Sequence, residues 1–342
     1  TNNKPIVVIG HMSDMVREHL GDKAEIALQE EQLGTGHAVM MAEHYIDDED
    51  EVLILCGDTP LIKGETLKEM TKIKSEGYAA VVMSAVEDDP TGYGRIIRDE
   101  SNDFMRIREQ KDASEEEKAI KEINAGMYII NGKLLKENLS KLSVNNAQRE
   151  YYLTDVLEHI KNAGHRIGVY QADKMEIMGV NSRLQLSEAE RIMRLDVNKM
   201  HMANGVTLID TNSTYIDKNV KIGRDTIIYP NCHIKGNSVI GEDCIIRENT
   251  TIEDSHIENH VTIKSSTILS SKVGATTKIA QYNDILLSVR APVGPTNLSP
   301  GTVCIGRGLA AIRPDDSLYL KYLLFYFRYF ETQLSAKGTG TT

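Results

Sequence analysis

The sequence from residue 216 to residue 252, written in blocks of six, is IDKNVK, IGRDTI, IYPNCH, IKGNSV, IGEDCI, IRENTT and I. Each block begins with isoleucine, so seven isoleucines recur six residues apart without a break. This period matches neither an α-helix, with about 3.6 residues per turn, nor a flat strand, in which side chains alternate. It is typical of a parallel β-helix whose coils have three faces, each directing one aliphatic side chain inward.

The alternative is a set of ordinary strands whose isoleucines fall in step by chance, and an unbroken register of this length counts against it. Gly223 and Gly241 each follow an isoleucine directly, one coil apart. We expect both glycines to occupy tight corners where the backbone φ is positive. The six-residue period is expected to run from about residue 206 to about residue 275.

Length and composition limit the possible classes of protein. The chain has 342 residues, enough for two domains. Its 39 Lys+Arg and 50 Asp+Glu give a net charge of −11, which argues against nonspecific binding to nucleic acid or to a membrane surface. The four cysteines have no close spacing, so no zinc or disulfide framework is predicted. We see no signal peptide or long apolar run, and we expect a soluble, cytoplasmic chain.

Short apolar runs alternate with helical patterns before the repeat begins. Strands are expected at 5–9, 52–55, 79–86 and 123–130, and helices at 12–20, 37–46, 66–76 and 155–163. This alternation predicts a doubly wound, Rossmann-like α/β sheet, in which ligands bind beyond the carboxyl ends of the strands. Residues 185–203 contain no Gly or Pro and predict a helix that connects this domain to the repeat.

One candidate site is the stretch QEEQLGTGHA, residues 29–38. Gly34 would let backbone amides approach a ligand, and Thr35 offers a hydroxyl at the start of a helix. Gln29 and Gln32 supply paired hydrogen-bond donors and acceptors, which suit the edge of a pyrimidine. A plain loop that caps the following helix explains the same residues, and the local pattern leaves this alternative open.

A second candidate is Asp58, which follows a buried strand and is a natural Mg²⁺ ligand, although it could equally cap the next helix. Other polar stretches lie where strands or loops end. They are residues 92–95, Glu109, 124–126, 151–155 and 179–181. Turn formation explains any one of these stretches when it is taken singly.

Taken in order, these motifs resemble a bacterial bifunctional family that makes UDP-N-acetylglucosamine. The motifs are QLGTGHA, DDPTGYGRI, EYYLTD and GVNSRLQL, and the resemblance covers residues 4–275. In that family an N-acetylglucosamine-1-phosphate uridyltransferase domain precedes a left-handed β-helix that acetylates glucosamine-1-phosphate. The resemblance implies a Mg²⁺-dependent reaction of UTP with N-acetylglucosamine-1-phosphate, giving UDP-N-acetylglucosamine and pyrophosphate. It also implies a homotrimer formed through the β-helix.

The resemblance assigns roles to individual positions. Four residues are expected to hold the uridine nucleotide: Gln29, Gln32, Gly34 and Thr35. Asp58 and Asn181 are expected to bind Mg²⁺, with Asn181 next to the substrate as well. Four residues are expected to contact the N-acetylglucosamine unit: Gly94, Glu109, Asn124 and Thr154.

The chain also departs from the family pattern. The family opens with a glycine-rich phosphate loop and a lysine, and its acetyltransferase histidine lies in later coils. This chain starts after the phosphate loop and the lysine, and its repeat ends before the coils that carry the histidine. We therefore expect no certain catalytic residue and impaired uridyltransferase activity. The expected parts are a nucleotidyltransferase domain without its phosphate loop at 1–184, a connecting helix at 185–205, a truncated β-helix at 206–276 and an α+β tail at 277–342.

The tail is similar to the specificity subunits of type I restriction–modification enzymes. The similarity lies in residues 283–294, residues 305–313 and the closing GTGTT. It indicates a chimera of two partial genes, and the alternative is a divergent cap on the β-helix. Two further functions therefore stay open, a DNA target-recognition fragment and a remnant of a β-helix acyltransferase. The acidic chain favours neither nucleic acid nor membrane as a partner.

Overall fold

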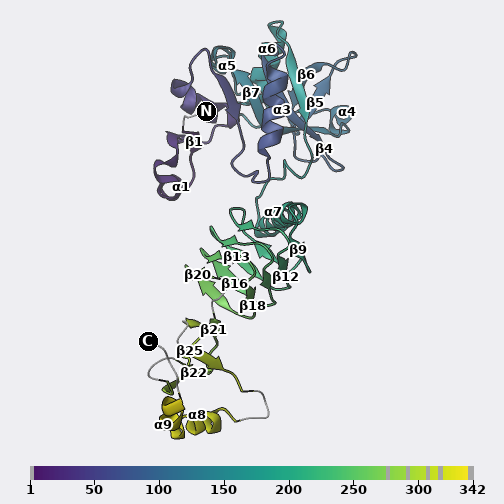
Figure 1. The fold of residues 1–342 in the computed structure, drawn as a ribbon. Coiled ribbons are helices and arrows are strands. Elements are labelled where there is room, and N and C mark those ends of the chain that lie inside the picture. The colour runs from purple at the N-terminus through teal and green to yellow at the C-terminus, as the bar shows by residue number, and fades with distance from the viewer. Residues whose placement is uncertain (1–3, 275–277, 290–292, 306–308, 315–318, 338–342) are drawn as a thin grey trace. The chain divides into compact units, whose positions relative to one another are not determined.

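The computed structural model describes residues 4–274, 278–289, 293–305, 309–314 and 319–337 (Figure 1). The chain divides into two compact units, Thr1–Ala189 and Glu190–Thr342. Their boundary lies within the helix α7 (Arg183–Ala203), which matches the predicted connecting helix closely. Each unit is described by itself below.

The first unit is built on a mixed sheet of six strands in the order β6–β5–β7–β4–β8, with β3 also paired to β7. Their bounds are β3 Glu51–Ile54, β4 Ala80–Val86, β5 Arg95–Arg98, β6 Phe104–Arg108, β7 Glu122–Asn131 and β8 Ile167–Gln171. A separate parallel pair joins β1 (Ile6–Ile9) to β2 (Glu25–Leu28) around the helix α1 (Ser13–Leu20).

The strand β7 gives the sheet its mixed character. It runs antiparallel to β3, β4 and β5, whereas β4 and β8 are parallel. The segment between β4 and β7 contains the β5–β6 hairpin and the four-residue helix α4 (Glu115–Lys118) in place of a long crossover helix. Antiparallel neighbours such as β4 and β7 need no crossover helix. The sheet is therefore mixed, whereas a doubly wound sheet would be parallel.

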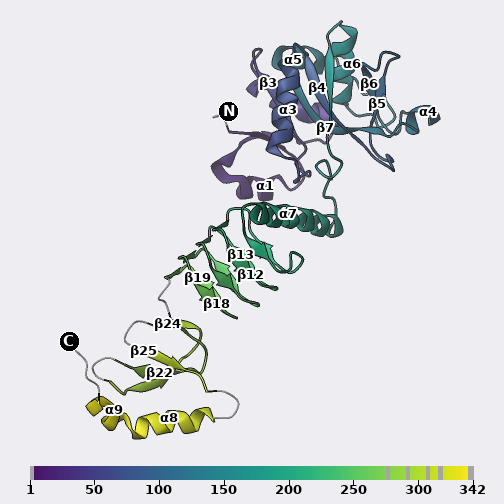
Figure 2. The same ribbon diagram turned by 45° about the vertical axis from the view of Figure 1, so that its right-hand side comes forward.

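Helices cover both faces of this sheet, as Figure 2 shows for α3 on one side and for α5 and α6 on the other. The helices are α2 Thr35–Ala42, α3 Gly64–Lys74, α5 Gly132–Leu139 and α6 Thr154–Asn162. In β4, Ala80 and Val82 join the core under α5 and α6, and Val81 and Met83 join the core under α3. A strand buried on both faces is a continuous apolar run, and this is why the sequence predicted it.

Several elements escaped the sequence prediction. They are β2, β5, β6, β8 and α5. In β5, Arg95 and Arg98 flank two isoleucines, and β6 has arginines at positions 106 and 108. Their buried residues, Ile96, Phe104 and Ile107, join the core but follow no regular alternation along the sequence, so only the folded sheet identifies these strands.

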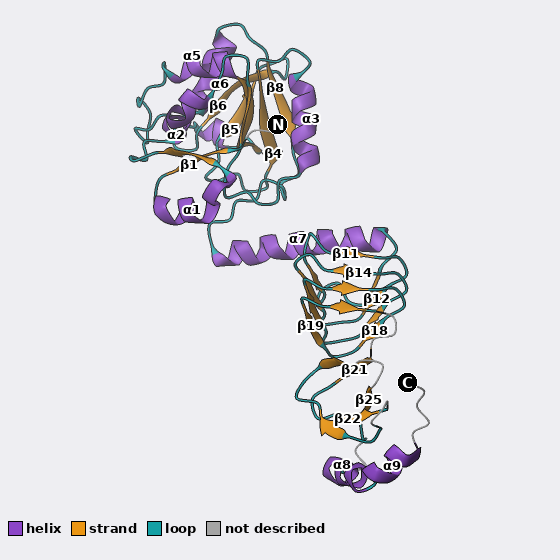
Figure 3. Cartoon of the chain, turned by 60° about the vertical axis from the view of Figure 1, so that its left-hand side comes forward, coloured by secondary structure: helices purple, strands orange, loops and turns teal. Residues whose placement is uncertain are grey.

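The second unit opens with stacked coils that form three parallel sheets, in the orders β9–β12–β15–β18, β10–β13–β16–β19 and β11–β14–β17–β20 (Figure 3). Their bounds are β9 Thr207–Leu208, β10 Tyr215–Ile216, β11 Lys221–Ile222, β12 Ile227–Ile228, β13 His233–Lys235, β14 Val239–Ile240, β15 Ile245–Ile246, β16 Thr251–Glu253, β17 His256–Ile257, β18 Thr262–Ile263, β19 Thr267–Leu269 and β20 Lys272–Val273.

The isoleucine repeat forms the core of these coils. Ile216 pairs with Ile234 and Ile234 with Ile252, so a coil takes three six-residue blocks. Six of the seven isoleucines are buried, and Ile222 is half-buried. The β-helix predicted from their period is confirmed.

The six-residue period ends earlier than predicted. Ile252 pairs with Ile268, and Ile257 with Val273, so the coils after Ile252 are shorter. A corner can lose one residue while the inward position of each strand is kept. The prediction that the period continues to about residue 275 was therefore wrong, because stacking conserves the pairing of the strands and not the length of the corners.

The corners also differ from the prediction for Gly223 and Gly241, which are not among the residues with positive φ. A Cβ on Gly223 would lie 2.6 Å from the backbone nitrogen of Glu242 in the next coil, so close approach excludes a side chain there. Positive φ is adopted instead by Asp225, Asn231, Asp243 and Asn249. Asp and Asn tolerate this conformation because their short polar side chains can form local hydrogen bonds.

The described residues of the tail form antiparallel strands and two helices. The strands are β21 Lys278–Ala280 paired with β24 Val303–Ile305, and β22 Ile285–Ser288 between β23 Thr296–Leu298 and β25 Leu309–Ile312; the helices are α8 Leu320–Tyr329 and α9 Glu331–Lys337. Parts of the motifs noted in the tail, at 290–292, 306–308 and 338–342, lie outside the described residues. No helix in the described part of the chain is both long and apolar enough to cross a membrane.

Candidate functional site

The loop between β2 and α2 holds both predicted glutamines in fixed orientations. The side-chain amide of Gln29 donates to the carbonyl oxygen of Gly34 at 3.2 Å and lies 3.0 Å from Nδ1 of His37. The amide of Gln32 donates to the carbonyl oxygen of Gln29 at 3.2 Å. Gln29 is buried, so these bonds determine which way its carboxamide faces.

This loop is attached to the segment that precedes α6. The backbone nitrogen of Gly36 donates to the carbonyl oxygen of Tyr151 at 2.8 Å, and that of Leu153 donates to Oγ1 of Thr35 at 3.2 Å. A Cβ on Gly34 would lie 2.6 Å from the carbonyl oxygen of Tyr151. The hydroxyl predicted to face the nucleotide thus accepts a structural hydrogen bond, and its own proton can still be donated.

The four predicted sugar contacts come together from four separate segments. Oγ1 of Thr154, at the start of α6, donates to Oε1 of Glu109 at 3.1 Å. A Cβ on Gly94 would lie 3.4 Å from both carboxylate oxygens of Glu109. The backbone nitrogen of Asn124 in β7 donates to the carbonyl oxygen of Gly94 at 2.8 Å. Buried Thr154 therefore fixes the Glu109 carboxylate beside Gly94.

Asn124 contacts Tyr128, a residue that the sequence analysis did not identify. Its amide Nδ2 contacts the hydroxyl of Tyr128 at 2.7 Å, and its Oδ1 accepts from the backbone nitrogen of Gly126 at 3.1 Å. Burial raises the pKa of the Tyr128 hydroxyl, which therefore stays protonated. The signal for Tyr128 was its position four residues after Asn124 in one strand, where both can face the same side.

Asp58 and Asn181 meet beside a glycine. The point that a Cβ on Gly179 would occupy lies 3.3 Å from Oδ2 of Asp58 and 3.4 Å from Nδ2 of Asn181. The backbone nitrogen of Val180 donates to the carbonyl oxygen of Asp58 at 2.8 Å, which holds the two loops together. A side chain at position 179 would fill the space between these two polar groups.

Hydrogen bonds, close approaches and chain neighbours connect all of these groups. Cys56, two residues before Asp58, donates through its Sγ to the carbonyl oxygen of Gly126 at 3.3 Å. The connected residues run in the order Gln32, Gln29, Gly34, Thr35, Leu153, Thr154, Glu109, Gly94, Asn124, Gly126, Cys56, Asp58, Gly179 and Asn181. The structure thus brings the ten predicted residues into one continuous arrangement. Within the described residues, no three His, Cys, Asp or Glu side chains form a metal-binding group.

Comparison with known proteins assigns this domain to a family. A family model described as nucleotidyl transferase matches residues 2–176, about half of the chain. The chain belongs to the nucleotidyl transferase family. A second model, described as bacterial transferase hexapeptide with six repeats, matches residues 219–254 within the β-helix.

Curated relatives of this nucleotidyl transferase carry the name Bifunctional protein GlmU. The chain is 52% identical over 279 residues to the protein of Clostridioides difficile and 53% identical over 281 residues to that of Caldanaerobacter subterraneus. These alignments cover 81% and 82% of this chain and 61% and 62% of the relatives. The relative from Geobacillus is 47% identical over 306 residues, which is 89% of this chain and 65% of the relative.

The chain therefore spans just over three fifths of the length of the relatives that it matches. The comparisons do not support the interpretation of the chain as a chimera, and they favour neither a DNA-recognition fragment nor an isolated acyltransferase remnant. The resemblance of the tail to restriction specificity subunits receives no support from them.

A buried arginine within the predicted polar stretch 92–95 fixes the part of the nucleotidyl transferase domain that carries Gly94 and Glu109. Arg95 is only 1% exposed and donates to the carbonyl oxygen of Tyr93 and to Oε1 of Gln110, the latter at 2.8 Å. It also donates to the carbonyl oxygen of Lys118 at 3.3 Å. Since Tyr93 precedes Gly94 and Gln110 follows Glu109, Arg95 connects the two segments that hold these site residues.

The electrostatic state of Glu109 follows from its surroundings in the nucleotidyl transferase domain. Burial raises the pKa of its carboxyl above the ordinary value, and the hydrogen bond from Thr154 opposes that shift. The nearby carboxylates of Asp155 and Asp112 raise the pKa further. The ionised form is therefore held in the fold at a cost to stability, which is a common property of functional sites.

We predict that Glu109→Gln stabilises the fold near neutral pH. Because the folded pKa is raised, the native state binds more protons than the unfolded chain above the ordinary pKa of 4.5, so stability falls as pH rises through that window. The glutamine carbonyl can still accept from Thr154, and it carries no charge to desolvate. Denaturant unfolding at a series of pH values should show a stabilisation at pH near 7 that disappears below the ordinary pKa.

Glu100→Gln is the matched control, because Glu100 lies in an exposed turn. It should leave the pH dependence of unfolding unchanged. A Glu109→Gln protein that is no more stable than the wild type near pH 7 would contradict the role given to burial.

Proposed function

We propose that the nucleotidyl transferase domain joins UTP and N-acetylglucosamine-1-phosphate into UDP-N-acetylglucosamine, with release of pyrophosphate. The observation that carries this proposal is the continuous arrangement described above. It has two oriented glutamines at one end, the Glu109 group in the middle and the Asp58–Asn181 pair at the other end. The relatives named Bifunctional protein GlmU, at about half identity, support it.

The uridine end would be selected by Gln29 and Gln32. A carboxamide presents one donor face and one acceptor face, so a carboxamide in a fixed orientation distinguishes the edges of different bases. The bond from Gln29 to Gly34 supplies that orientation. A base with the wrong edge would leave buried polar groups of the protein without hydrogen-bond partners. This penalty discriminates between bases more strongly than the loss of an attractive contact does.

The sugar would lie against Glu109 and Asn124. A carboxylate accepts several hydrogen bonds, so Glu109 can accept from a sugar hydroxyl while it accepts from Thr154. The amide of Asn124 can contact the acetamido group, and the absence of a side chain at Gly94 leaves space for the ring. Thr154 contributes by holding the carboxylate in place.

Asp58 and Asn181 would hold Mg²⁺. The fit rests on the carboxylate of Asp58 and the carboxamide of Asn181, which meet beside Gly179. Asn181 would bind through Oδ1, because Mg²⁺ takes oxygen ligands, commonly one or two from the protein together with substrate phosphates. When bound, Mg²⁺ would neutralise and orient the phosphates. The reaction itself is attack by the sugar-1-phosphate oxygen on the α-phosphate of UTP, and the protein contributes mainly by positioning the reactants.

We also propose that the β-helix joins three copies of the chain and that the reaction takes place in the cytoplasm, where UTP is available. Ile227 and Ile245 support the first part, because they pair across neighbouring coils and are only half-buried. The predicted limits of the parts, at 1–184, 185–205, 206–276 and 277–342, belong to the same proposal.

Calorimetric titration of the full chain with UDP-N-acetylglucosamine, UDP and ADP tests the main proposal. We expect UDP-N-acetylglucosamine to bind about tenfold more tightly than UDP, and UDP about tenfold more tightly than ADP. Glu109→Gln should weaken binding of the sugar nucleotide by about tenfold and leave UDP unaffected. Equal affinities for UDP and ADP, or no gain from the sugar, would refute the assignment.

A further inference from the structure

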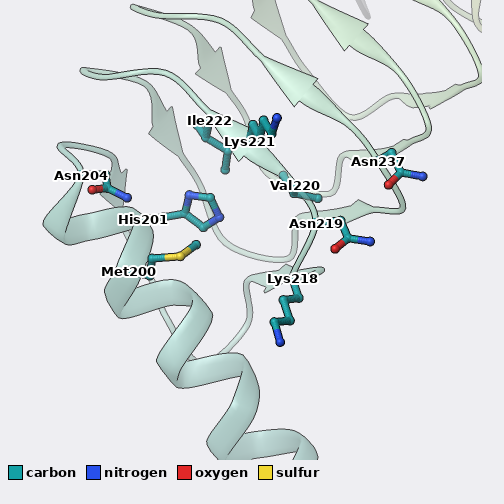
Figure 4. A pocket seen from close by; sticks show the side chains of 9 residues that line it. All are labelled: Met200, His201, Asn204, Lys218, Asn219, Val220, Lys221, Ile222 and Asn237. Carbon is teal, nitrogen blue, oxygen red and sulfur yellow. The ribbon is translucent and has the colours of Figure 1, made fainter. Parts of the chain in front are cut away.

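A separate cavity lies in the second unit, where α7 meets the first coils of the β-helix (Figure 4). Its volume is about 590 Å³. The lining residues come from the last turn of α7 and the residue after it, from the first coil and from the coil that follows: Met200, His201, Asn204, Lys218, Asn219, Val220, Lys221, Ile222 and Asn237. Nothing in the proposed uridylyl transfer uses this place.

The charge of the cavity contrasts with that of the chain. Lys218 and Lys221 contribute two ammonium groups, and none of the nine described lining residues is acidic, although the chain carries a net charge of −11. Asp217 and Asp254 lie nearby and accept from the backbone nitrogens of Gly236 and Asn237. The charge of the lining itself is positive, and positive charge in an acidic protein attracts anions. Phosphate oxygens are suitable partners for lysine ammonium groups.

Carboxamides add neutral polar groups to the lining. Lys221 pairs with Val239 in the next coil, so Asn219 and Asn237 occupy equivalent positions in neighbouring coils. Asn204 supplies a further carboxamide from the end of α7. Each carboxamide both donates and accepts hydrogen bonds, which suits the hydroxyl groups of a polar organic ligand.

His201 gives independent evidence for a ligand. His201 is only 3% exposed, and its Nε2 atom is buried without a hydrogen-bond partner among the described residues. Figure 4 shows its ring projecting from α7 toward the strand that carries Lys221. Burial lowers the pKa of the imidazole, so the neutral ring offers one donor and one acceptor. A buried nitrogen without a partner lowers stability, and a bound polar group would supply that partner.

The same cavity explains an exception in the core. Ile222 is the one member of the seven-isoleucine repeat that is not fully buried. With Val220 and Met200 it forms the apolar part of the lining. An apolar surface combined with a few polar groups is the usual composition of small-molecule sites, and the volume falls within their usual range of about 300–1,000 Å³.

We propose that this cavity binds a small phosphate monoester of about the size of a sugar phosphate. The phosphate is bound by the exposed lysines, Lys218 and Lys221, and the organic part contacts His201 and the three asparagines. The site is distinct from the nucleotide site, and its occupation stabilises the junction of α7 with the first coil.

The test uses the full chain with histidine imidazoles labelled for NMR, titrated with inorganic phosphate and with glucose 1-phosphate. The His201 signals, assigned by their loss in His201→Asn, report on the cavity and not on the nucleotide site. We expect saturable shifts with a dissociation constant of about 1 mM or below. Lys218→Met combined with Lys221→Met should weaken the effect by about tenfold or more.

The matched control combines Lys235→Met with Lys264→Met, which removes the same charge from exposed positions elsewhere on the β-helix. It should leave the titration unchanged. The proposal is overturned if the control weakens binding as much as the cavity variant does, or if the cavity variant binds normally. It is equally overturned if His201 does not respond to about 10 mM of either compound.

Discussion

Replacing Gly34 with alanine should weaken binding of uridine nucleotides by about 100-fold and lower the free energy of unfolding by about 3 kcal/mol. Gly34 has a φ of 108° and a ψ of 175°, a region open almost only to glycine. A Cβ there would also lie 2.6 Å from the carbonyl oxygen of Tyr151 and 2.9 Å from Cβ of Glu150. The backbone strain and the steric overlap each contribute roughly 1–3 kcal/mol.

The effect on binding follows from what Gly34 supports. Its carbonyl oxygen accepts from the side chain of Gln29, and the next residues attach the loop to Tyr151 and Leu153. Moving Gly34 away from Tyr151 therefore disturbs the orientation of Gln29 and the start of α2 together. Small displacements of positioning groups reduce binding and catalysis strongly.

Gly77→Ala separates the two causes. Gly77 has a φ of 88°, but a Cβ there would meet nothing within 4 Å. This control should show the strain alone, a loss of about 1–2 kcal/mol, with unchanged affinity for UDP. Denaturant unfolding and calorimetry on both variants measure the difference. Equal effects on UDP affinity in the two variants would show that the contact with Tyr151 does not position the nucleotide loop.

Asp58→Asn should remove the dependence of UTP binding on Mg²⁺. In the wild type we expect Mg²⁺ to strengthen binding of UTP by about 100-fold over binding with a chelator present, since the metal joins the protein to the phosphates. Asparagine keeps the shape of the side chain but removes the charge that a hard cation requires. Asp58 is exposed, and its backbone carbonyl oxygen, not its side chain, accepts from the backbone nitrogen of Val180, so the fold should be unaffected.

Asp103→Asn is the matched control, because Asp103 is also exposed and lies in the hairpin turn away from Gly179. It should retain the full Mg²⁺ effect. Asn181→Ala should reduce the effect partly, because the second ligand is neutral. If Asp58→Asn binds UTP with undiminished Mg²⁺ dependence, the pair beside Gly179 is not the metal site. Thermal unfolding of each variant excludes misfolding as the cause.

The sequence alone determined the β-helix and supplied the residues of the proposed site. The β-helix was predictable because its core repeats along the chain, and a one-dimensional period records which side chain points inward. The residues of the proposed site could be named because each motif lies in one short stretch, as Gln29 to Thr35 do. Because ligands bind beyond the carboxyl ends of strands, the stretches that follow strands could be expected to lie near one another.

Only the tertiary structure decided how those stretches meet. Tyr128 and Arg95 act on the site through Asn124 and through the neighbours of Glu109, and no local pattern marks such contacts. The same holds for the antiparallel direction of β7 and for the close approach that requires Gly223. These features depend on pairing between segments that are distant in the chain. Such pairing is decided by packing and by the satisfaction of buried polar groups, which local sequence does not record.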